Sequence, residues 1–304
     1  MNNNYQELYK LIPKDRIKLG EPMSLHTSFN IGGNADVFLT VENEEELAKV
    51  LACVSNNEME YLFVGNGSNF LVSDKGYRGV IIKLGGDFNE ISLDGNRITV
   101  GAARLLSSTS AFACKNGLAG LEFASGIPGT IGGAIFMNAG AYGGEMKDVV
   151  VNARVMSKDG SEVRTLSNEE LEFGYRHSAI QDGGNIVLSV VLELEPDKID
   201  DIQSRITELS NKRNSKQPVQ FPSAGSTFKR PVGGYAAALI EEAGLKGYTV
   251  GGAQVSEKHA GFVINIGGAS CSDVLSLMKH VQETVYKNSG IMLEPEVRII
   301  GEEF

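Results

Sequence analysis

Residues 64–74 read VGNGSNFLVSD, and this stretch does most to decide the kind of fold. The apolar run Tyr61–Val64 predicts a short strand, and FLVSD after the loop GNGSN is typical of extended chain. The loop offers several backbone N–H groups, the hydroxyl of Ser68 and the amides of Asn66 and Asn69. Such a concave run of donors suits a diphosphate without a helix N-terminus. An ordinary turn between two strands is the other interpretation, and the loop alone does not choose between them.

Two familiar nucleotide-binding patterns are excluded for this loop. Gly65-x-Gly67 follows a strand, as in a Rossmann motif, but the third glycine is missing and no helix opens after it. The chain also contains no GxxxxGK[ST] phosphate loop.

A second glycine-rich stretch favours ligand binding over an ordinary turn as the interpretation of the loop. Residues 124–144 read ASGIPGTIGGAIFMNAGAYGG, with seven glycines and four alanines. Small residues remove side chains where something flat or bulky must lie against the backbone. A close-packed contact between a helix and a sheet is the alternative. Two such stretches on either side of one hairpin region favour a large bound cofactor.

Composition and charge limit the remaining possibilities. The 304 residues predict two or three domains, and 42% hydrophobic with 22% charged residues is typical of a globular protein. The 36 glycines make up about 12% of the chain, against about 7% on average. A net charge of −10 argues against a nucleic-acid partner but not against a small anionic ligand, which needs only local positive charge.

Cysteine usage and the N-terminus indicate the compartment. Cys53, Cys114 and Cys271 are odd in number and far apart, so neither a disulfide framework nor a metal site is expected. The start, MNNNY, lacks a signal peptide, and no apolar run approaches the length of a membrane span. We therefore expect a cytoplasmic protein without a membrane partner, and a monomer because no exposed apolar repeat suggests otherwise.

Local patterns predict the elements of the first two hundred residues. Asn43 caps a helix whose apolar positions are Leu47, Val50, Leu51 and Val54. Further expected elements are the strand 79–83, a hairpin of 91–93 with 97–100, a hairpin of 152–157 with 162–166, a short helix opened by the capping box Ser167-x-x-Glu170, and the strand 185–194.

The pattern shifts after Pro196. A helix with Ile199, Ile202, Ile206 and Leu209 on one face precedes a basic loop from Lys212 to Lys216. The remaining expected elements are helices over 235–242 and 273–287, a strand over 261–266 and a final strand over 291–300. Domain boundaries are expected near residues 83 and 198.

Six segments in one order resemble a known family. They are HTSFNIGG (26–33), VGNGSNFLVSD (64–74), SGIPGTIGGAIFMNAGAYG (125–143), FGYRHS (173–178), SAGSTFK (223–229) and LEPEVR (293–298). The chain resembles the bacterial UDP-N-acetylenolpyruvoylglucosamine reductases (MurB), whose FAD-binding fold is shared with vanillyl-alcohol oxidase and p-cresol methylhydroxylase. The first two segments indicate the flavin fold alone, and the last three point to this enzyme family.

The resemblance implies an α+β protein of three domains with a p-cresol-methylhydroxylase-type FAD-binding region. The first domain spans 1–82 and is joined by the C-terminal strand 289–304, the second spans 83–198, and the third, spanning 199–288, closes over the UDP-sugar. The expected FAD-binding residues are Gly65, Asn66, Gly67, Ser68, Asn69, Ser125, Gly126, Gly132, Gly133 and Asn138. The implied reaction is reduction of the enolpyruvyl ether of UDP-N-acetylglucosamine to UDP-N-acetylmuramate in peptidoglycan precursor synthesis, with NADPH as the hydride source.

Hydride addition to that double bond pushes negative charge into the substrate carboxylate. The protein then needs a cation beside the carboxylate, a polarising group for the second oxygen and a proton donor for the other carbon. A lone arginine is usually a solvated surface residue, but Arg176 matches the family motif FGYR-x-S, and its planar fork can bind a carboxylate through two hydrogen bonds. The predicted short helix should lie just before it.

Ser226 is the expected proton donor. Most loop serines belong to turns or caps, and only the context SAGSTFK selects this one. A serine hydroxyl is a poor acid, so it must be held close to the carbon it protonates and away from water.

Glu296 is the expected polarising group. Alternation along a strand would put Glu294, Glu296 and Arg298 on one face, so spacing leaves both glutamates open, and the family motif selects Glu296. To donate a hydrogen bond it must be protonated, which requires burial to raise its pKa.

A local basic set is expected to hold the substrate diphosphate. Arg213, Lys216, Lys229 and Arg230 make up this set, with Lys216 at its centre, and Tyr175 is a further expected substrate contact. A solvated basic loop is the alternative. Only Ala179–Gly184 separate FGYRHS from the next strand, so the chain resembles the shorter subfamily, which lacks an inserted loop bearing a tyrosine.

Two other functions remain open. An oxidase or dehydrogenase of the same fold would act on an alcohol or phenol, but such proteins use aromatic pockets, and this chain has no Trp and 7% aromatic residues. A non-catalytic sugar-nucleotide binder would not need a proton donor, and Arg176, Ser226 and Glu296 weigh against it.

Overall fold

The computed structural model describes residues 3–302, and the chain divides into two compact units. Unit 1 comprises Met1–Leu19, Val37–Asn66 and Gly79–Asn211, and unit 2 comprises Gly20–Asp36, Gly67–Arg78 and Lys212–Phe304. The mixed helix and sheet content agrees with the predicted α+β class. The division into three domains at residues 83 and 198 stays a prediction.

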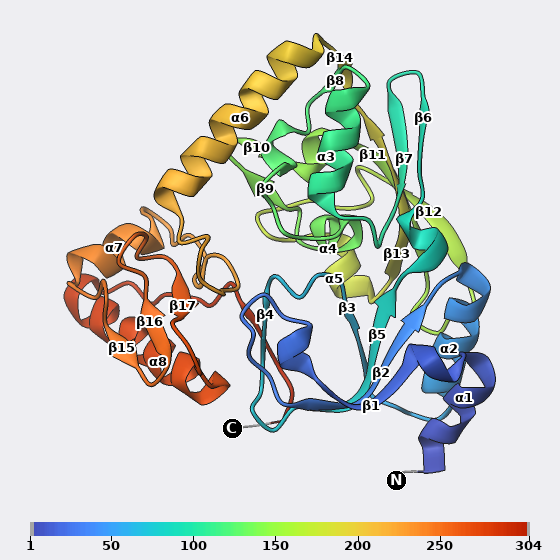
Figure 1. The fold of residues 1–304 in the computed structure, drawn as a ribbon, viewed down its shortest axis with the longest axis horizontal. Coiled ribbons are helices and arrows are strands. Elements are labelled where there is room, and N and C mark those ends of the chain that lie inside the picture. Colours follow the sequence, from blue (N-terminus) through green and yellow to red (C-terminus); the bar gives the residue numbers. More distant parts are fainter. Residues whose placement is uncertain (1–2, 303–304) are drawn as a thin grey trace. The chain divides into compact units, whose positions relative to one another are not determined.

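The larger sheet of unit 1 has five strands in the order β12-β11-β13-β7-β6 (Figure 1). These are β6 (Ile91–Asp94), β7 (Arg97–Gly101), β11 (Val150–Met156), β12 (Val163–Ser167) and β13 (Ile186–Glu193). All neighbouring pairs are antiparallel, so the two predicted hairpins and the predicted strand 185–194 are confirmed.

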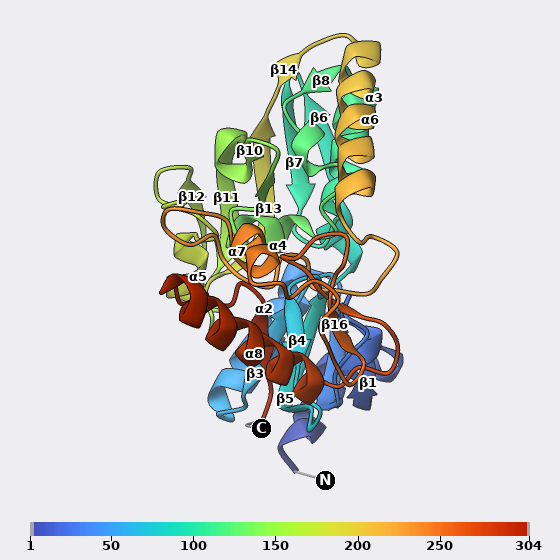
Figure 2. The same cartoon turned by 90° about the vertical axis from the view of Figure 1, so that its left-hand side faces the viewer.

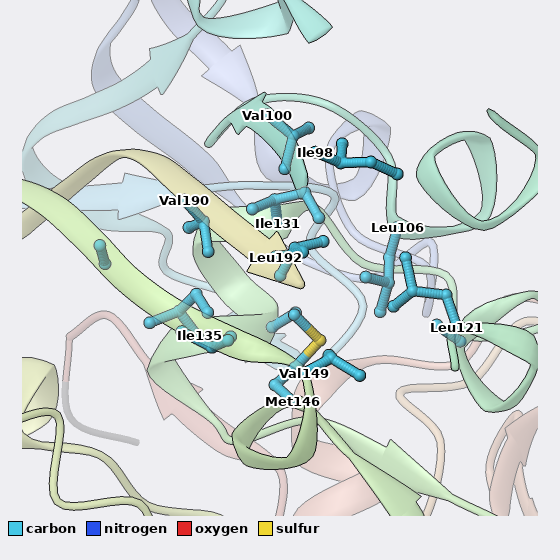
Figure 3. Packing of buried hydrophobic residues seen from close by; sticks show 14 of the residues in the cluster. Ile98, Val100, Leu106, Leu121, Ile131, Ile135, Met146, Val149, Val190 and Leu192 are labelled. Atoms are coloured by element: carbon cyan, nitrogen blue, oxygen red, sulfur yellow. The ribbon is translucent and has the colours of Figure 1, made fainter. Parts of the chain in front are cut away.

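Three helices and one short strand share a core with this sheet: α3 (Leu106–Lys115), α4 (Ile131–Phe136), α5 (Ala179–Gly183) and β8 (Leu118–Ala119). The other short strands of unit 1 are β9 (Gly140–Ala141), β10 (Gly144–Glu145) and β14 (Glu195–Pro196). Figure 3 shows Val100 and Val190 from the sheet packing against Ile131 and Ile135 of α4. All four are fully buried, and burying each such side chain contributes about 1.5–3 kcal/mol. This burial fixes α4 on the sheet.

A second sheet has the order β1-β2-β5-β3, from β1 (Ile17–Pro22), β2 (Asn34–Val41), β3 (Tyr61–Val64) and β5 (Tyr77–Leu84). Strands β3 and β5 run parallel, joined through the loop and β4 (Phe70–Val72). Helix α2 (Glu44–Asn56) packs its predicted apolar face on this sheet, and the side chain of Asn43 accepts a hydrogen bond from Glu46 N, which confirms the cap. The short helix α1 (Leu8–Leu11) joins the same core.

Unit 2 has its own sheet and core. Strands β15 (Thr249–Val250), β16 (Ala253–Val255) and β17 (Val263–Asn265) form an antiparallel sheet, and β4 pairs in parallel with β18 (Arg298–Ile300). Helices α7 (Ala236–Glu242) and α8 (Cys271–Ser289) pack in the core of this unit, and α8 is the dark red helix of Figure 2. Short 3-10 helices elsewhere in the chain occupy Asn3–Glu7, Lys14–Arg16, Met23–Leu25, Gly86–Asn89, Glu122–Ala124 and Met146–Asp148.

Three predicted elements were wrong in extent. The basic loop 212–216 is helical, because α6 runs through Ile199–Lys216 with no glycine or proline until Pro218 ends it. Ser167 and Glu170 make both capping-box hydrogen bonds, at 2.8 and 3.2 Å, yet the chain there forms only turns. The left-handed φ of +45° at Glu172 turns the backbone out of a helix.

The final strand is also shorter than expected. Only Arg298–Ile300 of the predicted strand 291–300 pair in a sheet, because Pro295 has no N–H and contacts Phe228 through a single bridge. Glu294 and Glu296 therefore do not lie on a regular strand. No helix within residues 3–302 is long and apolar enough to cross a membrane.

Candidate active site

The first half of the predicted FAD loop lies in unit 1 beside the second glycine-rich stretch. A Cβ atom on Gly65 would lie 2.5 Å from Thr130 Oγ1, so no larger residue fits there without movement. Asn66 Nδ2 donates a 2.8 Å hydrogen bond to the carbonyl of Pro128. The two glycine-rich stretches that the sequence singled out are thus in contact.

The second half of the loop belongs to unit 2, which the chain enters between Asn66 and Gly67. Gly67 has a φ of +60°, and a Cβ there would lie 1.9 Å from the carbonyl oxygen of His26. The carbonyl of Gly67 accepts a 3.1 Å hydrogen bond from Ser28 N. The conformation and the close approach both require glycine.

The loop leaves backbone donors available, which tests whether a dinucleotide cofactor fits. The backbone N–H groups of Asn66, Gly67 and Ser68 donate no hydrogen bond to any residue within 3–302. The N–H groups of Gly126 and Gly129 likewise have no acceptor in the part of the chain that the structure describes. Consecutive free N–H groups form an anion-binding surface. These residues fit the phosphates that the sequence assigned to the loop.

Helix α4 contributes packing rather than donors. Gly132 N donates to the carbonyl of Ala102 at 2.8 Å, and a Cβ on Gly132 would lie 3.2 Å from Ala102 Cβ. The N–H of Gly133 is taken up by the cap, Thr130 Oγ1, at 3.3 Å. The hydroxyl of Ser125 donates to a carbonyl of the preceding turn at 2.8 Å. At Gly132 the alternative reading, a close-packed contact, is the one supported.

Asn138 is fully buried, and its amide is used within unit 1. Its Nδ2 donates to Glu145 Oε2 at 2.8 Å and to the carbonyl of Gly174 at 3.0 Å, while Oδ1 accepts from Lys147 N at 3.0 Å. Both amide protons are thereby engaged. The structure gives Asn138 a positioning role, and its predicted contact with FAD stays a prediction.

Arg176 lies in a tight four-residue turn, Gly174–His177, of unit 1. The two end residues exchange backbone hydrogen bonds of 3.0 and 3.3 Å, and Arg176 has a left-handed φ of +54°. Its carbonyl accepts a 2.9 Å hydrogen bond from Gln181 Nε2. The guanidinium carbon lies 5.3 Å from the ring centroid of Tyr175, which is 55% exposed. A surface turn thus presents both predicted substrate residues together.

Ser226 lies in unit 2 on a segment fixed by its neighbours. Ala224, Thr227 and Phe228 are buried, whereas Ser226 itself is exposed. Thr227 N donates to the carbonyl of Gly261 at 2.9 Å, and Thr227 Oγ1 accepts from Val263 N at 2.9 Å. The chain on both sides of Ser226 is anchored while its hydroxyl stays accessible.

Glu296 lies on the segment next to Ser226. Its N–H donates to the carbonyl of Thr227 at 2.8 Å, so the residue after Ser226 is bonded directly to Glu296. The carbonyl of Glu296 accepts a 3.2 Å hydrogen bond from Asn69 Nδ2, and Arg298 N donates to the Asn69 carbonyl at 2.9 Å. Unit 2 therefore brings together Ser226, Glu296 and one end of the predicted FAD loop. Burial lowers the pKa of Arg298.

The predicted basic residues fall at two places. Arg213 and Lys216 are on the last turn of α6, where cations favour the helix dipole. Beside that turn, Lys258 Nζ donates to the carbonyl of Asn214 at 2.6 Å. Burial is the main cause of the lowered pKa of His259, and the charge of Lys216 adds to it.

Lys229 and Arg230 follow Ser226 along the chain. Lys229 Nζ lies 3.3 Å from Glu294 Oε2, so that glutamate forms an ion pair. The guanidinium carbon of Arg230 lies 4.0 Å from the ring centroid of Tyr235. Lys229 and Arg230 are both exposed and accessible to a ligand.

Two residues without any signal in the sequence belong to this neighbourhood. Gln181 donates a hydrogen bond to the Arg176 carbonyl. Arg104 has a buried Nε with no acceptor among the described residues. The next residue, Leu105, forms a β-bridge with Thr130 in the glycine-rich stretch. No group of three or more His, Cys, Asp and Glu residues within 3–302 is arranged to hold a metal ion.

Two family models match the chain. Residues 35–166 match the model of an FAD binding domain, and this range includes the whole loop 65–69 and the stretch 124–144. Residues 217–300 match the C-terminal domain of UDP-N-acetylenolpyruvoylglucosamine reductase, which includes Ser226 and Glu296.

Whole-length relatives extend this similarity. The chain is 50% identical over 305 residues to the UDP-N-acetylenolpyruvoylglucosamine reductase of Clostridioides difficile strain 630, with all of both chains covered. It is 50% identical to that of Alkaliphilus oremlandii, with 98% of both covered. The crystal structure of MurB from Thermus caldophilus superimposes with a TM-score of 0.83 at 39% identity, covering 94% of this chain and 99% of that one. The chain belongs to the UDP-N-acetylenolpyruvoylglucosamine reductase family.

Proposed function

We propose that the protein catalyses the FAD-dependent reduction of UDP-N-acetylglucosamine enolpyruvate by NADPH, giving UDP-N-acetylmuramate. The observation that carries this proposal is the pairing in unit 2, where the residue after the exposed Ser226 accepts a hydrogen bond from Glu296 N. A protein that only bound a sugar nucleotide would have no use for a proton donor beside an acid. The relatives named above carry the corresponding reductase name.

The residues proposed to hold FAD are those of the loop 65–69 and of the stretch 125–133. The free N–H groups of Asn66, Gly67 and Ser68 would bind the diphosphate, and Gly126 and Gly129 would add two more donors. Bound FAD would supply the redox chemistry, taking electrons from NADPH and passing them to the substrate double bond. The lack of a side chain at Gly65 lets the backbone of the loop lie close to Thr130 of the second segment.

Arg176 is proposed to bind the carboxylate of the enolpyruvyl group. Its guanidinium can donate two parallel hydrogen bonds to a carboxylate, which fixes both the position and the orientation of the group. The positive charge also stabilises the negative charge that develops on the carboxylate during reduction. Tyr175, beside it on the same turn and exposed, is proposed as a further substrate contact.

Ser226 is proposed to protonate the substrate carbon adjacent to the carboxylate, with its Oγ proton as the one transferred. The anchored backbone on both sides of it supports this role, because a weak acid needs accurate placement to be effective. The left-handed Gly225, with open space where a Cβ would stand, leaves room for the substrate.

Glu296 is proposed to polarise the second carboxylate oxygen as a hydrogen-bond donor. The hydrogen bond from Glu296 N to the carbonyl of Thr227 supports this role, because it ties Glu296 to the segment that bears Ser226. Lys216, with Arg213, Lys229 and Arg230, is proposed to bind the UDP diphosphate.

A spectroscopic experiment tests the proposal. The purified protein should show a flavin absorption spectrum, which NADPH bleaches and the enolpyruvyl UDP-sugar restores. Ser226→Ala should keep the NADPH half-reaction and slow the second one strongly. A colourless protein that FAD does not reconstitute would overturn the proposal, and equal losses in both half-reactions would remove Ser226 from its role.

We also propose a monomer in the cytoplasm, without nucleic-acid or membrane partners. Light scattering after size-exclusion chromatography checks the monomer, because a dimer would double the mass from the 32.6 kDa of one chain. Cell fractionation checks the location.

A further inference from the structure

The backbone at Arg176 adopts a conformation that it would rarely hold alone. Its φ of +54° is left-handed, a region that side chains other than glycine seldom occupy. Arg176 is the second central residue of the tight turn between Gly174 and His177, and a positive φ at this position is a feature of type II turns. Contacts from outside the turn are therefore needed to keep it populated, and they set the direction in which the guanidinium projects.

Gln181, on the short helix α5, supplies such a contact. Its carboxamide Nε2 donates to the carbonyl of Arg176 at 2.9 Å and to the carbonyl of Phe136 at 2.7 Å. A carboxamide has two N–H groups, and both are used here. Gln181 thus bridges the last residue of α4 to the peptide that follows the Arg176 side chain.

The anchor at the other end of the bridge is firm. Helix α4 is buried against the large sheet through Ile131, Ala134 and Ile135. The carbonyl of Phe136 also accepts a 3.0 Å hydrogen bond from Ser178 Oγ. A displacement of the Arg176 peptide would have to break a hydrogen bond to a fixed element.

We propose that Gln181 is a positioning residue for substrate binding: it holds the Arg176 peptide in its left-handed conformation and so aims the guanidinium at the substrate carboxylate. The inference rests on the role proposed above for Arg176. Gln181 bonds the carbonyl of Arg176 and not its guanidinium, so its effect passes through the backbone. It should therefore influence ligands that bear the carboxylate and leave others unaffected.

Binding to the oxidised, FAD-loaded protein tests this selectivity. Gln181→Met keeps the length of the side chain and removes both donors. We expect about tenfold weaker binding of the enolpyruvyl UDP-sugar, the size typical for losing such hydrogen bonds. Binding of UDP-N-acetylglucosamine, which has no carboxylate, should be unchanged. Isothermal titration calorimetry measures both constants, and equal weakening of the two ligands would overturn the proposal.

A matched control separates positioning from general damage. Gln203 is an exposed glutamine of α6 whose Nε2 lies 3.4 Å from Thr207 Oγ1. Gln203→Met should bind both ligands as the parent does. The rate of flavin reduction by NADPH, measured per bound flavin, should be the same in the parent and in Gln181→Met, so a folding defect would show in that rate or in the flavin content.

A double-mutant cycle distinguishes failure of this inference from failure of the proposed function. Arg176→Ala should abolish the discrimination between the two ligands, and adding Gln181→Met to it should have no further effect on kcat/KM. Full activity in Arg176→Ala would refute the role of Arg176 and the inference with it. The inference alone would be overturned if Arg176→Ala lowered kcat/KM strongly while Gln181→Met left it unchanged. Strictly additive losses of kcat/KM in the double variant would also overturn it.

Discussion

The two regions that carry the predicted catalytic residues are stabilised in different ways. In unit 1, side chains hold the Arg176 turn: Asn138 bonds the carbonyl of Gly174, and Gln181 bonds that of Arg176. In unit 2, Ser226 and Glu296 are held mainly by the main chain, through hydrogen bonds of Thr227 to Gly261 and of Glu296 to Thr227.

This difference determines how each region responds to substitution. A single side-chain change in unit 1 can loosen the Arg176 turn without touching Arg176. Single side-chain substitutions should disturb the Ser226 segment less, because a main-chain hydrogen bond survives most substitutions. Thr227 is its weak point, since its hydroxyl oxygen accepts a main-chain hydrogen bond.

The largest effects are expected at the two chemical groups themselves. Arg176→Ala should lower kcat/KM for the enolpyruvyl UDP-sugar by about 10²–10³, the usual loss for one electrostatic donor. Ser226→Ala should lower the rate of the second half-reaction by about 10²–10⁴, the range for a general acid. Stopped-flow absorbance of the flavin measures both. Slower reduction by NADPH in either variant would contradict the assignment.

Asn138→Leu should have the next largest effect, on stability. It leaves the carbonyl of Gly174, Lys147 N and a carboxylate oxygen of Glu145 without their partner, at a cost of about 2–4 kcal/mol in the free energy of unfolding. Urea denaturation measures this loss. The exposed Asn57, which bonds the carbonyl of Cys53, gives the control, because Asn57→Leu should cost less than about 1 kcal/mol. Equal losses would mean that burial is not the cause.

Thr227→Val should show the weak point of the other region. Valine has nearly the same shape but cannot accept from Val263 N, so a buried N–H loses its partner at a cost of about 1–3 kcal/mol. The rate of the second half-reaction should fall as well, because the Ser226 segment loses an anchor. Thr249→Val, at an exposed hydroxyl, is the control and should leave both quantities unchanged. A stable but slow variant would show that Thr227 acts on placement alone.

The smallest effect is expected at the cap of α8, a helix that belongs to the same buried core as Ala224 and Phe228. Hydrogen bonds from the main chain, first from Ser270 N, lower the pKa of Asp273. Asp273→Asn should cost about 0.5–1 kcal/mol near pH 7.

The pH dependence of that loss follows from the direction of the shift. A carboxyl group whose pKa is lower in the folded state stabilises it fully above the unfolded value of about 3.9, and the benefit disappears as the pH falls through the lower folded value. The difference between the parent and Asp273→Asn should therefore shrink below about pH 4. Urea denaturation at several pH values checks this, and activity at pH 7 should be unchanged.

Local signals made much of the fold predictable. The cap at Asn43, the helical spacing of Leu47, Val50, Leu51 and Val54, and the turns that close the two hairpins act within a few residues, and the structure confirms them. Composition singled out the two glycine-rich stretches, and the structure adds the contact between them, from Asn66 to Pro128.

Features that depend on partners far away in the sequence could not be predicted. The last strand shortens because Pro295 cannot donate to a neighbour that lies 67 positions earlier, at Phe228. Gln181 gave no signal because its partners are carbonyls, which every residue has. Asn138 matched a family motif, but only the structure shows that its amide is engaged by protein groups.

The left-handed backbone at Arg176 also carries an evolutionary consequence. Glycine would occupy this position of the turn with less strain than arginine. Selection for folding alone would therefore tend to replace Arg176 with glycine, whereas selection for carboxylate binding opposes that change. Position 176 is thus a place where stability and activity favour different residues. Copies of the gene released from selection for activity should lose this arginine early, and a glycine there would mark a protein that keeps the fold without the reaction.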